Sequence, residues 1–220
     1  MTDKNYDAIV VGARYAGAPT AMLLARRGHR VLLVDRARFP SDTVSTHLIH
    51  PPGLAALDRW GLLSRVTAGG LPEIATYAFD LGPVSLAGSP AGYGFPGSYA
   101  PRRTVLDKIL VDAASEAGAE VREAFSVEEL VTDGQGADGV VTGIRGREHD
   151  GPQVTERARV VIGADGAHSF VARAVGAASY AEKPKLQTSY YTYWSGLGFE
   201  HFEAFLRPDR AFAGGPPTTT

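Results

Sequence analysis

Residues 6–17, YDAIVVGARYAG, decide the fold of this 220-residue chain. The apolar run Tyr6–Val11 stops at a glycine, which is typical of a buried strand in a parallel sheet. From Gly17 to Gly28 apolar residues recur at helical spacing, and a glycine is a common C-terminal stop for a helix. Arg30–Asp35 reads as a second apolar strand. A strand, a glycine turn, a helix and a strand within about 30 residues predict one βαβ unit.

The turn between the first strand and the helix, Gly12–Gly17, has residues suited to a dinucleotide pyrophosphate. Gly12 supplies a tight turn, and Gly17 permits close packing of the helix on the strand. The N–H groups and the dipole of the helix favour a phosphate at this position. Arg14 stands where the pattern usually has its middle glycine. Its side chain must therefore point away from the phosphates or reach around to them.

Two carboxylates are candidates for contact with a nucleotide. Asp35 ends the second strand 18 residues after Gly17, near the spacing of about 20 at which an acidic residue accepts hydrogen bonds from ribose hydroxyls. The alternative is a solvated aspartate at a strand end. Asp165 lies in GADGAHS, residues 163–169, which is again placed between a strand and a helix. It either receives cofactor hydroxyls or caps the helix, and Gly166 permits a sharp turn or a close approach of phosphate.

The rest of the chain predicts four segments. Residues 1–70 are a nucleotide-binding βαβ segment, 71–100 an excursion toward a second domain, 101–180 the first domain continued, and 181–220 an incomplete piece of the second, β-rich domain. The end, residues 213–220, shows no packing pattern. Periodicity predicts helices over Pro51–Leu63, Arg102–Ala117 and His168–Val175. It also predicts strands over Thr76–Leu81, Val84–Leu86, Glu120–Arg122, Ser126–Thr132, Gly139–Arg145, Val154–Ile162 and Gln187–Gly198.

Four features together resemble the FAD-dependent aromatic hydroxylases, a flavoprotein monooxygenase family whose relatives include flavin halogenases and prenyl reductases. They are VVGARYAG at residues 10–17, LLVDR at 32–36, the helix beginning near Arg103, and VVIGADGAHSFVAR at 160–173. The resemblance implies an α/β fold: a Rossmann-like FAD-binding domain with a mostly parallel sheet, plus part of a β-rich substrate domain. It also implies that FAD is held by Gly12, Ala13, Arg14, Tyr15, Ala16, Gly17, Asp35, Arg36, Arg103, Val127, Asp165 and Gly166.

The resemblance further implies an oxidoreductase that uses NAD(P)H and oxygen to hydroxylate a small organic substrate. The family's later Gly-Asp-Ala-Ala-His type turn is absent, so the chain is similar to the first half of a longer enzyme. Two alternatives stay open: an FAD-dependent prenyl reductase, and a truncated fragment that binds a nucleotide without catalysis. The sequence assigns no catalytic acid or base. Arg103, which matches a residue near the pyrophosphate in the family, has Arg102 as a nearby competitor for that role.

Composition narrows the class of protein. The net charge is −2 and the chain has no cysteine, so neither nucleic-acid binding nor thiolate metal sites are expected. No apolar run approaches the ~18 residues of a membrane span, and we expect a cytoplasmic protein. A metal at His47 and His50 is disfavoured, since no third ligand has supporting spacing. The loop holding Ser45, Thr46 and His47 matches a family region near the flavin. The aromatic residues 190–194 suit either a substrate pocket or a core strand.

Overall fold

The structure, a computed structural model, describes residues 5–134, 139–184 and 188–216, which fall into two compact units. Unit 1 comprises residues 1–41 and 107–185, and unit 2 comprises residues 42–106 and 186–220. The sequence therefore leaves unit 1 after its second strand and returns to it within a helix. Each unit is described by itself. The four-segment division predicted above remains a proposal.

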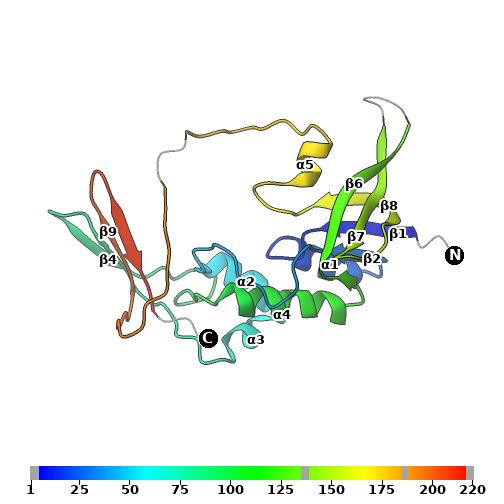
Figure 1. Cartoon of the computed structure of the whole chain (residues 1–220). Helices are drawn as coiled ribbons and strands as arrows, with labels where there is room; N and C mark the ends of the chain where they lie inside the picture. Colours follow the sequence, from blue (N-terminus) through cyan, green and yellow to red (C-terminus); the bar gives the residue numbers. More distant parts are fainter. Residues whose placement is uncertain (1–4, 135–138, 185–187, 217–220) are drawn as a thin grey trace. The chain divides into compact units, whose positions relative to one another are not determined.

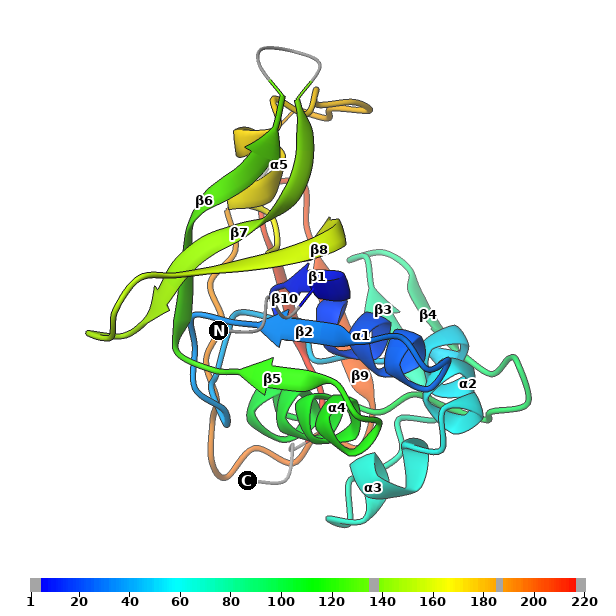
Figure 2. The same cartoon turned by 90° about the vertical axis from the view of Figure 1, so that its right-hand side faces the viewer.

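Unit 1 is built on a six-stranded sheet (Figures 1 and 2). The pairs β5·β2, β2·β1 and β1·β8 are parallel, whereas β8·β7 and β7·β6 are antiparallel. This arrangement confirms the predicted Rossmann-like α/β fold with a parallel-rich sheet. In the order in which they lie across the sheet, the strands are β5 (Glu120–Arg122), β2 (Val31–Val34), β1 (Asn5–Val11), β8 (Val154–Gly163), β7 (Val140–Glu148) and β6 (Phe125–Asp133).

The core of unit 1 covers both faces of β1 and β2, which carry buried apolar residues at consecutive positions. Ile9 and Val11 share a buried cluster with Val171 of helix α5 (Phe170–Ala174). Val10 points to the opposite face, toward helix α1 (Gly17–Ala25). The third helix, α4 (Arg103–Glu116), buries Leu110. Helix α1 on one face and the cluster containing Val171 on the other thus bury the end of β1, which belongs to the candidate site.

Unit 2 contains a second, smaller sheet in the order β10–β9–β3–β4. The pairs β10·β9 and β3·β4 are antiparallel, and β3·β9 is parallel. The β-rich character predicted for the second domain is therefore present. The elements of this unit are helices α2 (Pro51–Arg59) and α3 (Leu63–Thr67) and strands β3 (Tyr77–Asp80), β4 (Ser85–Gly88), β9 (Phe202–Leu206) and β10 (Ala211–Gly214).

Three sequence predictions of secondary structure are wrong. Residues 188–198 form no strand, and Gln187 lies outside the described residues. Tyr190 and Trp194 are 93% and 71% exposed, so their high β-propensity is not matched by a partner strand. The helix expected over Pro51–Leu63 ends at Arg59, because Gly61 adopts a φ of +75°. Strands β9 and β10 were not predicted. Strand β10 includes Ala213, although residues 213–220 were expected to show no packing.

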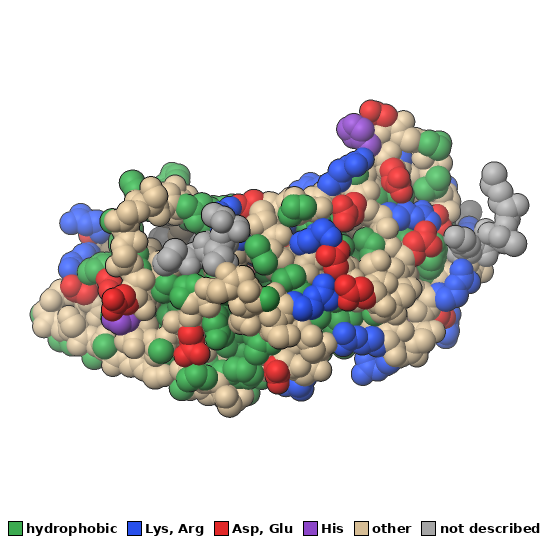
Figure 3. Space-filling model, turned by 90° about the horizontal axis from the view of Figure 1, so that it is seen from below, with side chains coloured by type: hydrophobic (Ala, Val, Ile, Leu, Met, Phe, Trp, Pro, Cys, Tyr) green, Lys and Arg blue, Asp and Glu red, His purple; other side chains and the backbone are tan. Residues whose placement is uncertain are grey.

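Charged side chains of both signs are intermixed over the surface drawn in Figure 3. Charged side chains also tie strands together inside unit 1. The Arg122 guanidinium donates to Glu120 at 2.7 Å and to Glu156 at 2.6 Å, linking β5 to β8. The Tyr6 hydroxyl donates to Glu120 at 2.8 Å. None of the helices in the described part of the chain is long and apolar enough to cross a membrane.

The substitution Tyr6→Phe tests this network by its effect on the stability of the protein at alkaline pH. Burial, together with the hydrogen bond to Glu120, raises the pKa of Tyr6 to about 12 from an ordinary value of 10. A raised tyrosine pKa stabilises the folded chain below pH 10, and that contribution is lost as the pH climbs from 10 toward 12. The free energy of unfolding, measured with urea, should fall between pH 10 and 12. It should fall less steeply in Tyr6→Phe than in the unmodified chain. Tyr180→Phe, at a residue that is 91% exposed, should decline as the unmodified chain does.

Candidate functional site

The carboxyl ends of three neighbouring parallel strands meet at one edge of the unit 1 sheet. Val11 of β1 is in register with Val34 of β2 on one side and with Gly163 of β8 on the other. The next residue along each strand therefore begins a turn at the same edge. The Gly12 N–H donates to Val34 O, and the Ala164 N–H donates to Val11 O, both at 2.8 Å. Ligands of open α/β sheets bind at such an edge, beyond the carboxyl ends of the strands.

Two glycines in the first turn have separate physical reasons to be glycine. Gly12 has a φ of +100°, and a Cβ there would lie 2.4 Å from Ala164 O. The first glycine turn thus packs directly on the second, at Ala164. A Cβ at Gly17 would lie 1.7 Å from Gly12 O and 3.1 Å from the side chain of Val10. Gly17 therefore lets α1 start against the strand, as the sequence predicts.

The N-terminus of α1 has no side-chain cap. Its N-cap residue is Ala16, which makes no side-chain hydrogen bond, and the first turn contains no acidic residue. Among its first three residues, Ala18 donates its N–H to Arg14 O at 3.0 Å and Pro19 has no N–H. The Gly17 amide is thus left for an acceptor from outside the helix, and an anion is a suitable one. Tyr15 and Ala16 are exposed beside this helix start, whereas Ala13 is buried.

Asp35 holds the first turn in place. Its Oδ2 accepts from the Ala13 N–H at 2.7 Å, and its Oδ1 accepts from the Ala37 N–H at 2.8 Å. Each carboxylate oxygen has a further lone pair, so both oxygens retain capacity to accept a hydroxyl. The sequence left open that Asp35 is a solvated aspartate at a strand end. In the structure both of its carboxylate oxygens accept backbone N–H groups. The neighbouring Arg36 is exposed.

Arg14 turns its side chain to the body of unit 1. Its guanidinium donates to the Asp107 carboxylate at 2.7 Å and to the Ser41 hydroxyl at 2.9 Å. It also lies over the ring of Phe39, 5.2 Å from the ring centroid. The sequence left open whether this side chain points away from the phosphates or reaches around to them. In the structure it points to other protein groups.

Asp107 was missed by the sequence analysis, although it carries a signal. It lies seven residues before Ala114, so both belong to the same stripe of α4. Both side chains are fully buried. A carboxylate within the apolar stripe of an amphipathic helix is unusual, because buried charges need a partner. Nothing in the pattern identifies that partner, which lies 93 residues earlier in the chain.

Asp165 caps α5, which is one of the two roles that the sequence left open. Its Oδ2 accepts from the Phe170 N–H at 2.6 Å and the Val171 N–H at 3.2 Å. The Ser169 hydroxyl accepts from the Ala172 N–H. The start of α5 is thus satisfied by side chains, in contrast to that of α1. Gly166 has a φ of +85°, and nothing lies within 4 Å of the place where its Cβ would be.

Two further predicted cofactor residues lie elsewhere. Val127 is half-buried on β6 and packs against the unit 1 core. It is paired with Gly146 just before an irregularity in the ladder. Arg103 is the first residue of α4, half-buried, and belongs to unit 2. The structure thus gathers the turn residues, Asp35 and Asp165 at one sheet edge, and the cofactor roles of all predicted residues remain predictions.

Unit 2 holds a polar cluster around His47, a residue weighed for a cofactor contact. His47 has a φ of +58°, and its Nε2 is 2.7 Å from the Tyr193 hydroxyl. Arg102 donates to Asp42 at 2.7 Å and stacks on the Tyr193 ring. Burial lowers the pKa of His47, and Asp42 partly opposes this shift. The described residues contain no group of three His, Asp or Glu side chains that could hold a metal ion.

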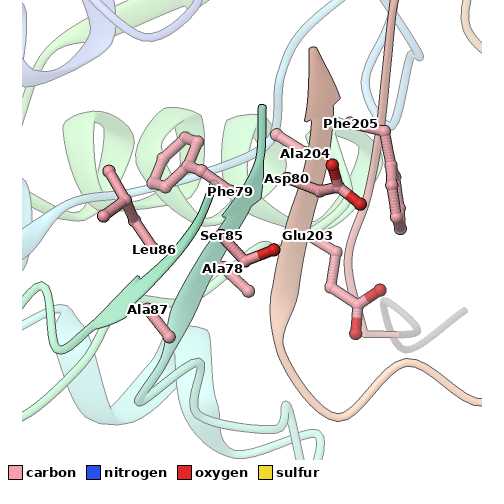
Figure 4. A pocket seen from close by; sticks show the side chains of 9 residues that line it. All are labelled: Ala78, Phe79, Asp80, Ser85, Leu86, Ala87, Glu203, Ala204 and Phe205. Atoms are coloured by element: carbon pink, nitrogen blue, oxygen red, sulfur yellow. The ribbon is translucent and has the colours of Figure 1, made fainter. Parts of the chain in front are cut away.

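A shallow hollow of about 200 Å³ lies on the unit 2 sheet (Figure 4). Phe79 and Leu86 lie on one side, and Asp80, Glu203 and Phe205 lie on the other. Residues that pair across neighbouring strands share a face, and Phe79 pairs with Leu86. The hollow combines aromatic and acidic side chains from β3, β4 and β9.

The model of the FAD binding domain family matches residues 5–204 of this sequence. This chain belongs to the FAD-binding domain family. Its matched range spans both glycine turns, Asp35 and α4. The family membership confirms the resemblance drawn from residues 10–17, 32–36 and 160–173.

Curated relatives and solved structures agree with this membership. The chain is 32% identical over 181 residues to digeranylgeranylglycerophospholipid reductase 2 of Methanopyrus kandleri, covering 78% of this chain and 40% of the relative. It thus spans about two fifths of that relative's length. The flavin-dependent halogenase CmlS superposes with a TM-score of 0.74 at 22% identity, over 98% of this chain and 40% of CmlS. PqsL, a probable FAD-dependent monooxygenase from Pseudomonas aeruginosa, gives 0.66 at 24% identity, over 83% and 48%.

Gly12→Ala should be far more destabilising than Gly28→Ala. Both glycines have a positive φ, +100° and +85°, but nothing lies within 4 Å of a Cβ at Gly28. Gly28→Ala should therefore cost only the left-handed penalty of about 1–2 kcal/mol. Gly12→Ala adds the overlap with Ala164, so we expect roughly 3 kcal/mol or more. Urea unfolding measures both, and equal losses would contradict the close packing of the two turns.

Proposed function

We propose that the edge formed by β1, β2 and β8 binds the adenosine diphosphate half of FAD. The observation that carries this proposal is the uncapped N-terminus of α1, placed by register beside Asp35 and the turn after β8. The Gly12 and Ala13 amides already donate to Val34 O and Asp35, so the later part of the turn up to the Gly17 amide would hold the pyrophosphate, and Asp35 would accept the ribose hydroxyls. Within unit 1, Arg36, Val127, Asp165 and Gly166 complete the proposed contacts, and the cofactor contact of Arg103 stays a prediction from the sequence.

The residues present fit this half of the cofactor. Gly17 brings the start of α1 to the strand end, and the Asp35 oxygens keep acceptor capacity after binding two backbone amides. Gly166 leaves open space where a side chain would stand. The Gly17 amide offers a donor to an anion, and no acidic residue stands in the first turn of α1 to repel one.

The protein's role at this site is to bind and orient. Bound FAD supplies electron and hydride transfer, which no amino-acid side chain provides. Asp35 fixes the Ala13 amide, so the turn is ordered before the ligand arrives. A preordered turn loses less conformational entropy on binding. The described residues give no acid or base a position from which to act on a substrate, so we assign none.

We propose further that the complete protein is an NAD(P)H- and oxygen-using monooxygenase of a small organic substrate, acting in the cytoplasm. The likeness to PqsL, described as a probable FAD-dependent monooxygenase, supports this proposal. The second candidate is an FAD-dependent prenyl reductase, which is favoured by the 32% identity to digeranylgeranylglycerophospholipid reductase 2. Oxygen uptake coupled to NAD(P)H oxidation supports the first, whereas anaerobic reduction of an isoprenoid without oxygen uptake selects the second.

Titration of FAD into the 220-residue protein tests the binding proposal directly. Flavin fluorescence should change saturably, and ADP should compete because it carries the pyrophosphate and adenosine that the site recognises. FMN lacks the adenosine half, so it should compete poorly. Absence of FAD binding contradicts the proposal, whereas weak binding without NAD(P)H oxidation favours the non-catalytic fragment. Equal competition by FMN and ADP would place the binding energy outside this sheet edge.

Asp35→Asn should weaken FAD binding and loosen the turn. Each Asp35 oxygen accepts one backbone N–H, and an asparagine must point its NH₂ at one of them, leaving two donors face to face. We expect a loss of about 1–3 kcal/mol in unfolding free energy and a weaker affinity for both FAD and ADP. Asp150→Asn is the matched control, because that side chain is 93% exposed. Unchanged ADP affinity in Asp35→Asn would exclude the ribose contact.

A further inference from the structure

Arg14 belongs to the first glycine turn, but its side chain is committed to groups outside that turn. The guanidinium donates through Nη1 to Asp107 Oδ2 at 2.7 Å and to Ser41 O at 3.2 Å. Through Nη2 it donates to Ser41 Oγ at 2.9 Å. The ring of Phe39, itself only 8% exposed, covers the guanidinium. The side chain is therefore held in one place by α4 and by the loop that follows β2.

The ion pair is asymmetric in burial. The Asp107 side chain is fully buried, and that of Arg14 is 25% exposed. A buried carboxylate is costly unless an opposite charge and hydrogen bonds satisfy it, so Asp107 fixes the guanidinium firmly. The backbone follows, because Arg14 O accepts from the Ala18 N–H at 3.0 Å in the first turn of α1. A continuous set of contacts thus joins α4 to the helix start that faces the proposed pyrophosphate.

We propose that Arg14 and Asp107 are positioning residues whose ion pair orders the Gly12–Gly17 turn for the cofactor. The inference rests on the proposed FAD site and adds to it a requirement for Asp107, a helix residue outside the nucleotide turns. Arg14 replaces the middle glycine of the dinucleotide pattern without contacting phosphate. The affinity for FAD therefore depends on a charge that does not touch it.

Three variants isolate the pair: Arg14→Met, Asp107→Asn and the double variant. Each single variant should weaken FAD and ADP binding roughly tenfold. The double variant should bind no worse than the weaker single variant, because both substitutions remove the same contact. Arg14→Lys keeps a charge opposite Asp107 and should bind better than Arg14→Met, although an ammonium cannot reproduce the fork of three hydrogen bonds. Arg159→Ala, at a side chain that is 84% exposed, is the control.

Amide hydrogen exchange gives a readout that needs no ligand. The Ala13 and Ala18 N–H groups donate to Asp35 and to Arg14 O, so their protection reports the order of the turn. In the FAD-free protein we expect both amides to exchange roughly tenfold faster in Arg14→Met and Asp107→Asn. The amides of Leu32 and Leu33 in β2 should keep their rates in both variants. The visible circular dichroism of bound flavin should change with the same variants.

The outcomes separate this inference from its rivals. Tight FAD binding by Asp107→Asn together with weak binding by Arg14→Met would show that Arg14 contacts the phosphate itself, which overturns the inference. Wild-type affinity in both single variants also overturns it. Failure of the unmodified protein to bind FAD or ADP removes the proposed function. The exchange rates of Ala13 and Ala18 then still decide whether the pair orders the turn, and unchanged rates overturn that claim.

Discussion

The contact on which the site depends is the approach of the Gly12 backbone to the backbone of Ala164. It requires a residue without a Cβ, since that atom would lie 2.4 Å from Ala164 O. The approach is possible because β1 lies between β2 and β8 with its last residue in register with both. Two turns that are separated by about 150 residues of sequence therefore begin at one place. Parallel pairing alone provides this arrangement, because it puts the carboxyl ends of neighbouring strands on the same edge.

Two aspartates at this edge of the sheet have different structural roles. Asp35 and Asp165 both accept two backbone N–H groups, but Asp165 uses them to begin α5, whereas Asp35 orders a turn in front of α1. The start of α1 is left without a cap. An uncapped helix start costs stability in isolation, so its presence beside a capped one is informative. The difference between the two helix starts is consistent with the anion site proposed in front of α1.

Local pattern predicted much of unit 1, because β1 and β2 are short apolar runs buried on both faces and α4 has an apolar stripe. The turn at Gly12, the strand just before Asp35 and the helix containing Leu110 all follow from residues that are close in sequence. The pairing of Arg14 with Asp107 does not, since it joins positions 93 residues apart and charge pattern carries no information on which partners meet. The aromatic segment near Tyr193 misled for a related reason. Its β-propensity is real, but a strand needs a neighbour, and propensity does not supply one.

The arginine at position 14 also shows that the glycines of the usual pattern meet different requirements. Gly12 needs a positive φ and room for the Ala164 backbone, and Gly17 needs room for the Gly12 carbonyl. Arg14 needs neither, because it is not among the residues with a positive φ and its side chain leads away from the turn. Glycine at the middle position gives a turn that is free to approach phosphate but costs conformational entropy to order. A side chain tied to a buried charge reduces that cost, provided that the charge is present on α4. The substitution at position 14 therefore makes physical sense only together with Asp107, and the two residues are best regarded as one feature of the site.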